Sequence, residues 1–184
     1  MGVWRSATLV LVAALAGCAG PVAPPPFAPP ISERYGAPAV ERPLDVTAIF
    51  ADACSQLTNA ELEQLTISSE GKHRSFLGDS QCRWTSRNDD ILAMSIYRDR
   101  DLLVDAYRSR LLPVFQPTTV AGYPAVREAT SPQNNNCVVT VGLGPEQALR
   151  SDWTGLGAFR PGDPDPCERA ESAAAFVVRK LSPR

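Results

Sequence analysis

The chain has 184 residues, of which 44% are hydrophobic and 21% are charged, and it contains 18 Lys and Arg against 20 Asp and Glu. This length and composition suit one globular domain with additional segments, and they exclude a chain that is disordered throughout. The formal net charge of -2 provides no basic surplus to neutralise phosphates, which argues against a nucleic-acid partner and against a polybasic membrane patch.

The N-terminus is predicted to be a lipoprotein signal peptide over residues 1–17. Arg5 precedes the uncharged run Ala7–Ala16, which is rich in Ala, Leu and Val, as in the n-region and h-region of such signals. The run is well short of the roughly 20 residues that a transmembrane helix needs. It ends in Leu15-Ala16-Gly17-Cys18, which resembles the lipobox of bacterial lipoproteins. In such precursors diacylglycerol alkylates the cysteine and the chain is cut before it, so Cys18 is the predicted lipid-attachment residue.

A proline-rich tether is predicted to follow, so that residues 18–43 comprise the lipidated cysteine and the tether. Eight of the 25 residues from Ala19 to Pro43 are proline. Such a segment favours the extended polyproline conformation, and at about 3.1 Å per residue it would hold the domain up to roughly 75 Å from the bilayer. The remaining residues, 44–184, are predicted to form one globular domain.

Four cysteines in this predicted domain indicate two disulfides, because an even number of cysteines in an exported chain is typical of disulfide pairing. Three connectivities are possible. We favour the one in which each pair joins a helix to a nearby strand: Cys54 with Cys82 and Cys137 with Cys167. Zinc is the alternative, but zinc sites need close ligand pairs, whereas the spacings here are 28, 55 and 30 and His73 is the only histidine. We therefore expect no metal site and no cofactor.

Three helices are predicted from their end signals and apolar spacing. The first covers residues 59–66, behind a capping box. The second is capped by Asp99 or Asp101 and carries Leu111 at the end of its apolar face. The third begins at Pro166, a residue type that suits the first position of a helix.

Between these helices the hydrophobic period changes to two, which is typical of strands. The predicted strands are Cys82–Ser86, Leu92–Ile96, Thr118–Ala121, Tyr123–Ala129, Cys137–Leu143 and Ala148–Thr154. The resulting order of elements is α, β-β, α, β-β-β-β, α. It predicts an α+β fold in which three helices flank a single antiparallel sheet, and the two disulfides are expected to join helices to this sheet.

Motifs along the whole chain accompany the lipobox and the tether. They are Cys54 before the first helix, Cys82-Arg83-Trp84, Gly122-Tyr123-Pro124-Ala125-Val126, the strand of Cys137, and Cys167-Glu168-Arg169-Ala170. Together they resemble an actinobacterial lipoprotein family of unknown function, the domain-of-unknown-function family thirty-five fifty-eight. The resemblance implies an exported lipoprotein with no established activity and no functional residues to carry over. The topology is also similar to the PsbP-like α/β/α sandwich, although likeness of fold does not give function.

No catalytic grouping is visible in the sequence. No serine lies in the G-x-S-x-G context of common serine hydrolases. His73 lies in a polar segment predicted to be a loop, where a solvated surface histidine is a simpler interpretation than a general base. Trp153 and Tyr123 are the candidate lining of a ligand cleft, although single aromatic residues on strands usually belong to the core.

The sequence therefore predicts a non-catalytic protein in the cell envelope, anchored to the outer face of the cytoplasmic membrane through lipidated Cys18. We expect it to bind an envelope protein or an apolar envelope molecule. The alternative is a small envelope hydrolase or transferase that uses carboxylates, which a perturbed carboxylate pair in a deep polar cleft would favour. A third hypothesis is an accessory subunit of a membrane assembly, which a flat apolar patch would favour over a pocket.

Overall fold

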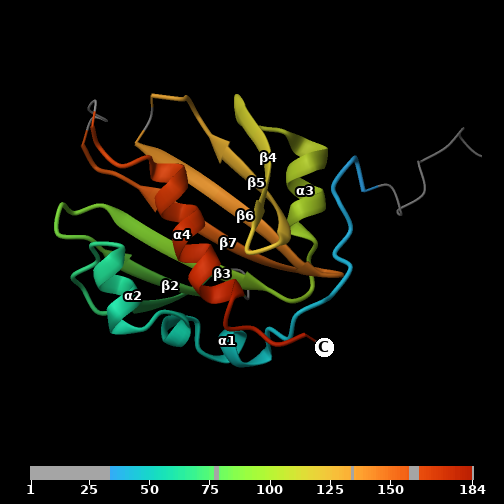
Figure 1. The fold of residues 1–184 in the computed structure, drawn as a ribbon, viewed down its shortest axis with the longest axis horizontal. Helices are drawn as coiled ribbons and strands as arrows, with labels where there is room; N and C mark the ends of the chain where they lie inside the picture. The colour runs from blue at the N-terminus through green and yellow to red at the C-terminus, as the bar shows by residue number, and fades with distance from the viewer. Residues whose placement is uncertain (1–33, 77–78, 134, 158–161, 184) are drawn as a thin grey trace, which may run out of the picture. The chain divides into compact units, whose positions relative to one another are not determined.

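A seven-stranded antiparallel sheet is the centre of the fold (Figure 1). The computed structural model describes residues 34–76, 79–133, 135–157 and 162–183. The predicted signal peptide, the predicted lipid-attachment residue Cys18 and the tether up to residue 33 lie outside the described residues.

The strands form one sheet in the order β1-β2-β3-β7-β6-β5-β4. They are β1 (Lys72–Phe76), β2 (Asp79–Thr85), β3 (Ile91–Tyr97), β4 (Val114–Val120), β5 (Tyr123–Ala129), β6 (Asn136–Gly144) and β7 (Gln147–Thr154). The helices are α1 (Thr47–Ala51), the 3-10 helix η1 (Ala53–Gln56), α2 (Asn59–Gln64), α3 (Leu102–Ser109) and α4 (Pro166–Val178). All neighbouring strands are antiparallel, which confirms the predicted α+β fold with a single sheet.

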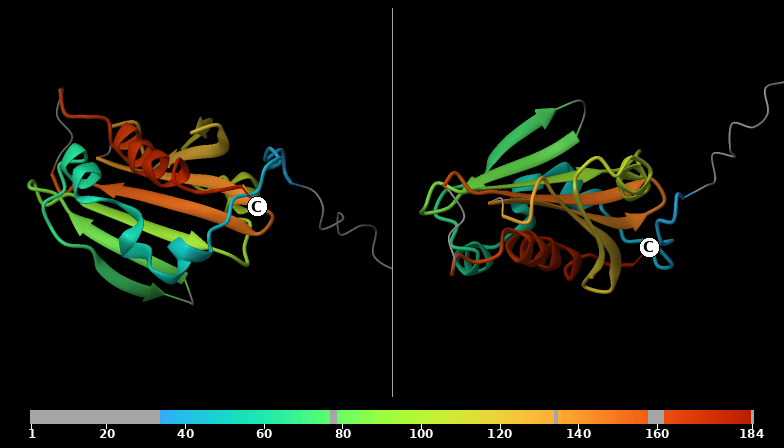
Figure 2. Two further views of the ribbon diagram at one scale, coloured as in Figure 1. Left: turned by 60° about the horizontal axis from the view of Figure 1, so that its bottom comes forward. Right: turned by 90° about the horizontal axis from the view of Figure 1, so that it is seen from above.

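Helices lie on both faces of the sheet (Figure 2). On one face α4 packs against β6 and β7, and η1 packs against β2. On the opposite face α3 packs against β5, β6 and β7, and its Leu103 shares a small apolar cluster with Val126. In the described part of the chain no helix lies over β1, β2 and β3 on this second face (Figure 2).

The main core lies between the sheet and α4. Leu92, Met94 and Ile96 occupy alternate positions of β3 and are fully buried. Trp84 and Trp153 belong to the same cluster, each with 1% of its surface exposed. The residues that α4 buries here are mostly small: Ala170, Ala173, Ala174, Val177 and Val178. Small side chains let the helix approach the strands closely, and the burial of apolar surface holds the two layers together.

Two disulfides join helices to this sheet, and both follow the predicted connectivity. Cys54 of η1 is bonded to Cys82 of β2, with 4.9 Å between their Cα atoms. Cys137 of β6 is bonded to Cys167 at the start of α4, with 5.0 Å between their Cα atoms. Each bond therefore fixes one helical segment on the core face of the sheet.

One strand, β1, is missing from the sequence prediction, which placed His73 in a loop. This prediction was wrong, because β1 pairs with β2 over five residues. Its sequence, Lys-His-Arg-Ser-Phe, lacks an apolar alternation because the strand lies at the edge of the sheet. The side chain of His73 is nevertheless 59% exposed, and its Nε2 lies 3.0 Å from Oδ1 of Asp52. It is therefore a surface histidine, as predicted.

The second predicted helix, α3, ends earlier than expected. Of the two predicted caps, Asp101 is the N-cap, and its Oδ1 accepts a hydrogen bond from the backbone N–H of Val104 at 3.1 Å. Arg110 follows the helix in the left-handed conformation with φ of 42°, which ends the helix before Leu111. Leu111 is 81% exposed, so its predicted place on the buried helix face was wrong.

Two smaller differences concern short elements. Helix α1 was not among the three predicted helices, because its five residues are too few to show an apolar period. Strand β4 begins at Val114, before the predicted start at Thr118, and it includes Pro117. An edge strand tolerates proline because the backbone N–H groups on its outer side have no neighbouring strand to which they could donate a hydrogen bond.

The N-terminal segment, residues 34–44, contacts the domain although most of it was predicted to be tether. Arg34 Nη1 donates a hydrogen bond to Oδ2 of Asp101 at 2.8 Å, and Ala37 is buried beside α3. At the other end of the segment, the N–H of Leu44 donates to the carbonyl oxygen of Leu143 at 2.8 Å. The contacts of the domain therefore begin upstream of the boundary predicted at residue 44.

Asp101 has two roles that substitutions can separate, since one oxygen caps α3 and the other accepts from Arg34. Asp101→Ala removes both, and we expect the free energy of unfolding to fall by about 1 kcal/mol, mainly through loss of the cap. Asp101→Asn keeps a capping oxygen, so most of that stability should remain. Urea denaturation of the two variants measures the difference. Equal losses for Asn and Ala would show that the ion pair, not the cap, is the stabilising contact.

Candidate functional site

A polar groove crosses the open part of the sheet face that carries α3. It consists of two adjoining cavities of about 580 and 330 Å³, which share Arg100 and Arg150 in their walls. The first cavity lies over the strands and is lined by Asp79, Gln81, Ser95, Tyr97, Asp99 and Asp152 besides the two arginines. The second lies beside α3, and its lining includes Asp105, Leu111, Leu112, Glu128, Val138 and Thr140. We call the two together the open-face groove.

The period of two along the strands places these polar side chains in the groove. Arg150 and Asp152 alternate along β7 with Ser151 and Trp153, whose side chains are buried on the core face. Antiparallel pairing then brings Arg150 opposite Ser95 of β3, so that groove residues from different strands lie side by side. The same alternation therefore places apolar side chains on the core face of the sheet and polar side chains on the opposite face.

Three carboxylates of the groove, those of Asp79, Glu128 and Asp152, are harder to ionise than they would be in water. Burial raises the pKa of Asp152, and Arg150, whose Nη2 lies 3.3 Å from Oδ2 of Asp152, offsets only part of this effect. Burial also raises the pKa of Glu128, again against the charge of Arg150. The pKa of Asp79 is raised by burial as well, and the hydrogen bond from the Tyr97 hydroxyl lowers it only in part.

The two arginines of the groove already have carboxylate partners. Arg100 Nε donates a hydrogen bond to Oδ2 of Asp105 at 2.8 Å, and Arg150 contacts Asp152. Within the described residues, Asp79 and Glu128 form no ion pair. The groove therefore contains more carboxylates than cations to neutralise them.

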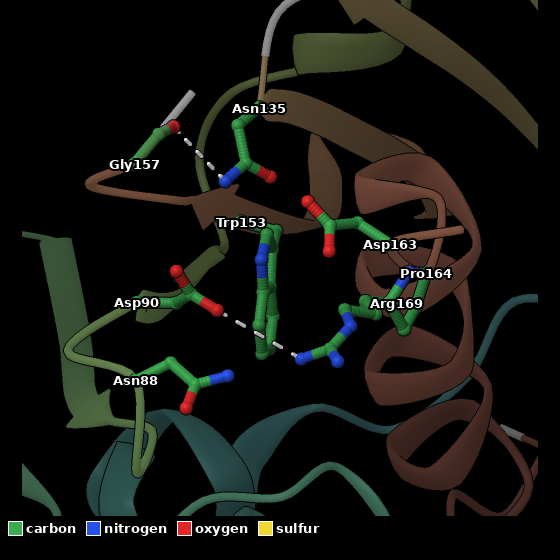
Figure 3. A pocket seen from close by; sticks show the side chains of 8 residues that line it. All are labelled: Asn88, Asp90, Asn135, Trp153, Gly157, Asp163, Pro164 and Arg169. Carbon is green, nitrogen blue, oxygen red and sulfur yellow. Dashed lines mark hydrogen bonds and ion pairs between the residues drawn. The ribbon is translucent and has the colours of Figure 1, made fainter. Parts of the chain in front are cut away.

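A smaller pocket of about 180 Å³ lies at the end of β7, beside the start of α4 (Figure 3). The guanidinium of Arg169 lies over the ring of Trp153, 4.6 Å from its centroid. Arg169 Nη1 also donates to Oγ1 of Thr66 at 3.2 Å and lies 4.0 Å from Oδ2 of Asp90. On the opposite side of the pocket, Asn135 Nδ2 donates to the carbonyl oxygen of Gly157 at 3.3 Å, as Figure 3 shows. The contacts of Arg169 connect α4 with the β2–β3 turn and with the residues that follow α2.

The structure does not bring the two aromatic residues of the predicted ligand cleft together. Trp153 lines the small pocket, but Arg169 covers its ring and only 1% of the residue is exposed. Tyr123 lines a different hollow, between the N-terminal segment and the β4–β5 turn. Trp153 is therefore placed as a core residue, and neither ring faces the open-face groove.

The groove residues were not among the residues predicted to form a site. The available signal was the alternation of charged and buried residues in Arg150-Ser151-Asp152-Trp153, which was interpreted only as a strand. No residue pattern marks the concavity itself, because it depends on how the side chains of several strands and of α3 are placed relative to one another.

The described residues offer neither a metal site nor a membrane-spanning helix. No group of three or more His, Cys, Asp or Glu side chains lies close enough to hold a metal ion there. In the same part of the chain, no helix is both long enough and apolar enough to cross a membrane. The four cysteines of the domain are all in disulfides.

A family model described as Protein of unknown function (DUF3558) matches residues 13–180. This range includes the end of the predicted signal peptide, the predicted tether and almost all of the globular domain. No curated protein and no solved structure matches the chain.

Proposed function

This chain belongs to the DUF3558 family of proteins of unknown function, as its motifs indicated, and from its own residues we propose that it is a lipid-anchored, non-catalytic binding protein on the outer face of the cytoplasmic membrane. The sequence Leu15-Ala16-Gly17-Cys18 and the uncharged run before it support the anchor. Two or three acyl chains on such a cysteine would hold the protein stably, whereas a single chain would not.

The open-face groove is the observation that carries the binding role. Its walls offer hydrogen-bond donors from Arg100 and Arg150 and acceptors from Asp79 and Asp152, and it is open to solvent. An apolar molecule placed there would leave these polar groups without partners, which costs free energy. We therefore propose that the ligand is polar. The sequence left open an envelope protein or an apolar envelope molecule, and the lining of the groove does not favour the apolar molecule.

The anchor is tested with Cys18→Ser, which removes the thiol that would carry the lipid. We expect the wild-type protein to enter the detergent phase of a Triton X-114 partition, and the variant to enter the aqueous phase or to remain unprocessed. Val22→Ala, which lies outside the lipobox, should behave like the wild type. Unchanged partition of a Cys18→Ser variant that has nevertheless lost residues 1–17 would refute lipidation at this residue.

The groove is tested by photo-crosslinking from one position inside it and one outside. A photoreactive amino acid at Gln81 faces the first cavity, whereas one at Thr119 lies on the exposed edge strand β4. We expect a dominant species in the native envelope to be labelled from position 81 and not from position 119. Labelling of the same species to the same extent from both positions would contradict a ligand held in the groove.

A second candidate function is hydrolysis or group transfer by carboxylates, and one observation favours it. Asp79 and Asp152 have raised pKa values, mainly through burial, and line the same polar cavity. An enzyme of this kind would lose turnover of envelope material in both Asp79→Asn and Asp152→Asn variants. Glu63→Gln, on the exposed side of α2, is the matched control and should retain it. Absence of turnover by the wild type would leave the binding role as the function.

A further inference from the structure

We infer that the open-face groove is a docking site for an extended segment of a partner protein that presents a basic residue and an apolar residue. This inference rests on the proposed binding function and specifies the partner. Three features of the groove lead to it: its excess of carboxylates, an exposed leucine at one end, and the open sheet face beneath it.

The charge of the groove selects for a cation. Five carboxylates line its two cavities, namely Asp79, Asp99, Asp105, Glu128 and Asp152, against the guanidinium groups of Arg100 and Arg150. Both arginines are already in contact with a carboxylate, so an entering anion would have to displace an existing partner. An entering Lys or Arg side chain would instead pair with Asp79 or Glu128, which form no ion pair within the described residues.

Other cations on the same face lie outside the two cavities. By strand register, Lys72, Arg74 and Arg83 are on the groove side of β1 and β2, but all three are exposed and none lines either cavity. They would repel a basic segment from the outer edge of the sheet. The basic residue is therefore expected inside the cavities, near Asp79 or Glu128.

The second cavity adds an apolar requirement. Leu111 is 81% exposed and lines this cavity together with Leu112 and Val138. An exposed leucine beside a row of polar groups suits a ligand with an apolar side chain next to a charged one. Protein segments supply this combination, whereas a glycan has no apolar side chain to place against Leu111. The amphipathic lining therefore favours a protein segment.

The expected contact is modest in strength and sensitive to salt. The cavities hold only a few residues, and an open surface screens charge pairs, so affinity should fall as ionic strength rises. Asp79→Asn combined with Glu128→Gln should weaken binding about tenfold, and Leu111→Ala should weaken it several-fold. Leu111→Ala is not expected to unfold the protein, because this side chain is already exposed to water.

The test uses the full-length protein in detergent and a fluorescent synthetic peptide that contains one leucine and two lysines. A second peptide, with both lysines acetylated, has the same length and backbone but no side-chain charge. Fluorescence anisotropy reports binding of each peptide to the wild type and to the variants. Leu156→Ala is the matched control for Leu111→Ala, because Leu156 is 65% exposed and lies outside the groove.

The inference would be supported if the lysine peptide binds to the wild type and if the groove variants weaken this binding. Acetylation of the lysines and added salt should weaken it as well. Equal binding of the acetylated peptide would overturn recognition of a cation while leaving the groove as a site for a polar ligand. Equal weakening by Leu111→Ala and Leu156→Ala would overturn the apolar contact. Failure of both peptides to bind at millimolar concentration would overturn the inference as a whole, and crosslinking from position 81 would still test the proposed function separately.

Discussion

Removing the Cys137–Cys167 disulfide by substitution of both residues with alanine is expected to lower the free energy of unfolding by about 3–4 kcal/mol. The bond closes a loop with a sequence separation of 30, and in the chain-entropy model a loop of that length restricts the unfolded chain by about this amount. A loss of this size is a large part of the stability of an ordinary domain. Denaturation with urea under non-reducing conditions, at a pH where the other disulfide stays intact, measures it.

The other disulfide provides the matched comparison. Cys54 and Cys82 are separated by 28 residues, so the same model gives nearly the same loss for the corresponding double alanine variant. The two losses should agree within about 1 kcal/mol if the constraint on the unfolded chain dominates. A loss below about 1 kcal/mol for the Cys137 and Cys167 variant would contradict a stabilising role for this bond.

Trp153→Ala is expected to cost about 3–5 kcal/mol of unfolding free energy, because it removes a large side chain from the core. Trp153 is 1% exposed, lies opposite Leu92 of β3 and Cys137 of β6, and has the guanidinium of Arg169 over its ring. The substitution would leave a cavity and would also leave Arg169 without its aromatic partner. Thermal or urea unfolding of the purified variant measures the loss.

Two further variants distinguish a core role of Trp153 from a ligand role. Trp153→Phe keeps an aromatic ring and should cost clearly less than Trp153→Ala. Tyr123→Phe removes only a hydroxyl from a partly exposed residue, so its effect should stay within about 0.5 kcal/mol. A Trp153→Ala variant as stable as the wild type, but unable to bind a ligand, would show that the predicted cleft role was correct and the core role wrong.

The sequence predicted those elements in which an apolar period is visible. Alternation in Leu92, Met94 and Ile96 identified β3, and the capping box of Thr58 and Glu61 identified the start of α2. The disulfide pairing followed because the predictions placed Cys82 and Cys137 on strands, Cys167 on a helix and Cys54 shortly before a helix. Local patterns were sufficient here because each element buries one face against its neighbours.

The sequence did not predict features that depend on tertiary position. β1 is polar because an edge strand has little to bury, so its pattern resembles a loop. Leu111 fits the apolar period of α3, but the left-handed Arg110 turns the chain away first. Along each strand the groove residues are the polar residues that alternate with buried ones. A sequence pattern shows only that such residues face away from the core. Their convergence depends on where α3 leaves the sheet open, and no short motif encodes this.

The Arg34–Asp101 contact also determines where mechanical load would enter the domain. Tension applied through the preceding residues would reach the protein at this partly exposed ion pair, at the N-terminal end of α3. An exposed ion pair of this kind contributes only about 0–1 kcal/mol to stability. It would therefore break before the backbone hydrogen bond between Leu44 and Leu143 at the sheet. Once Ala37 had also left its cluster beside α3, residues 34–43 could straighten to a total length of at most about 33–36 Å while the sheet remained folded. The segment can thus act as an extensible link that absorbs a pull before the core bears it.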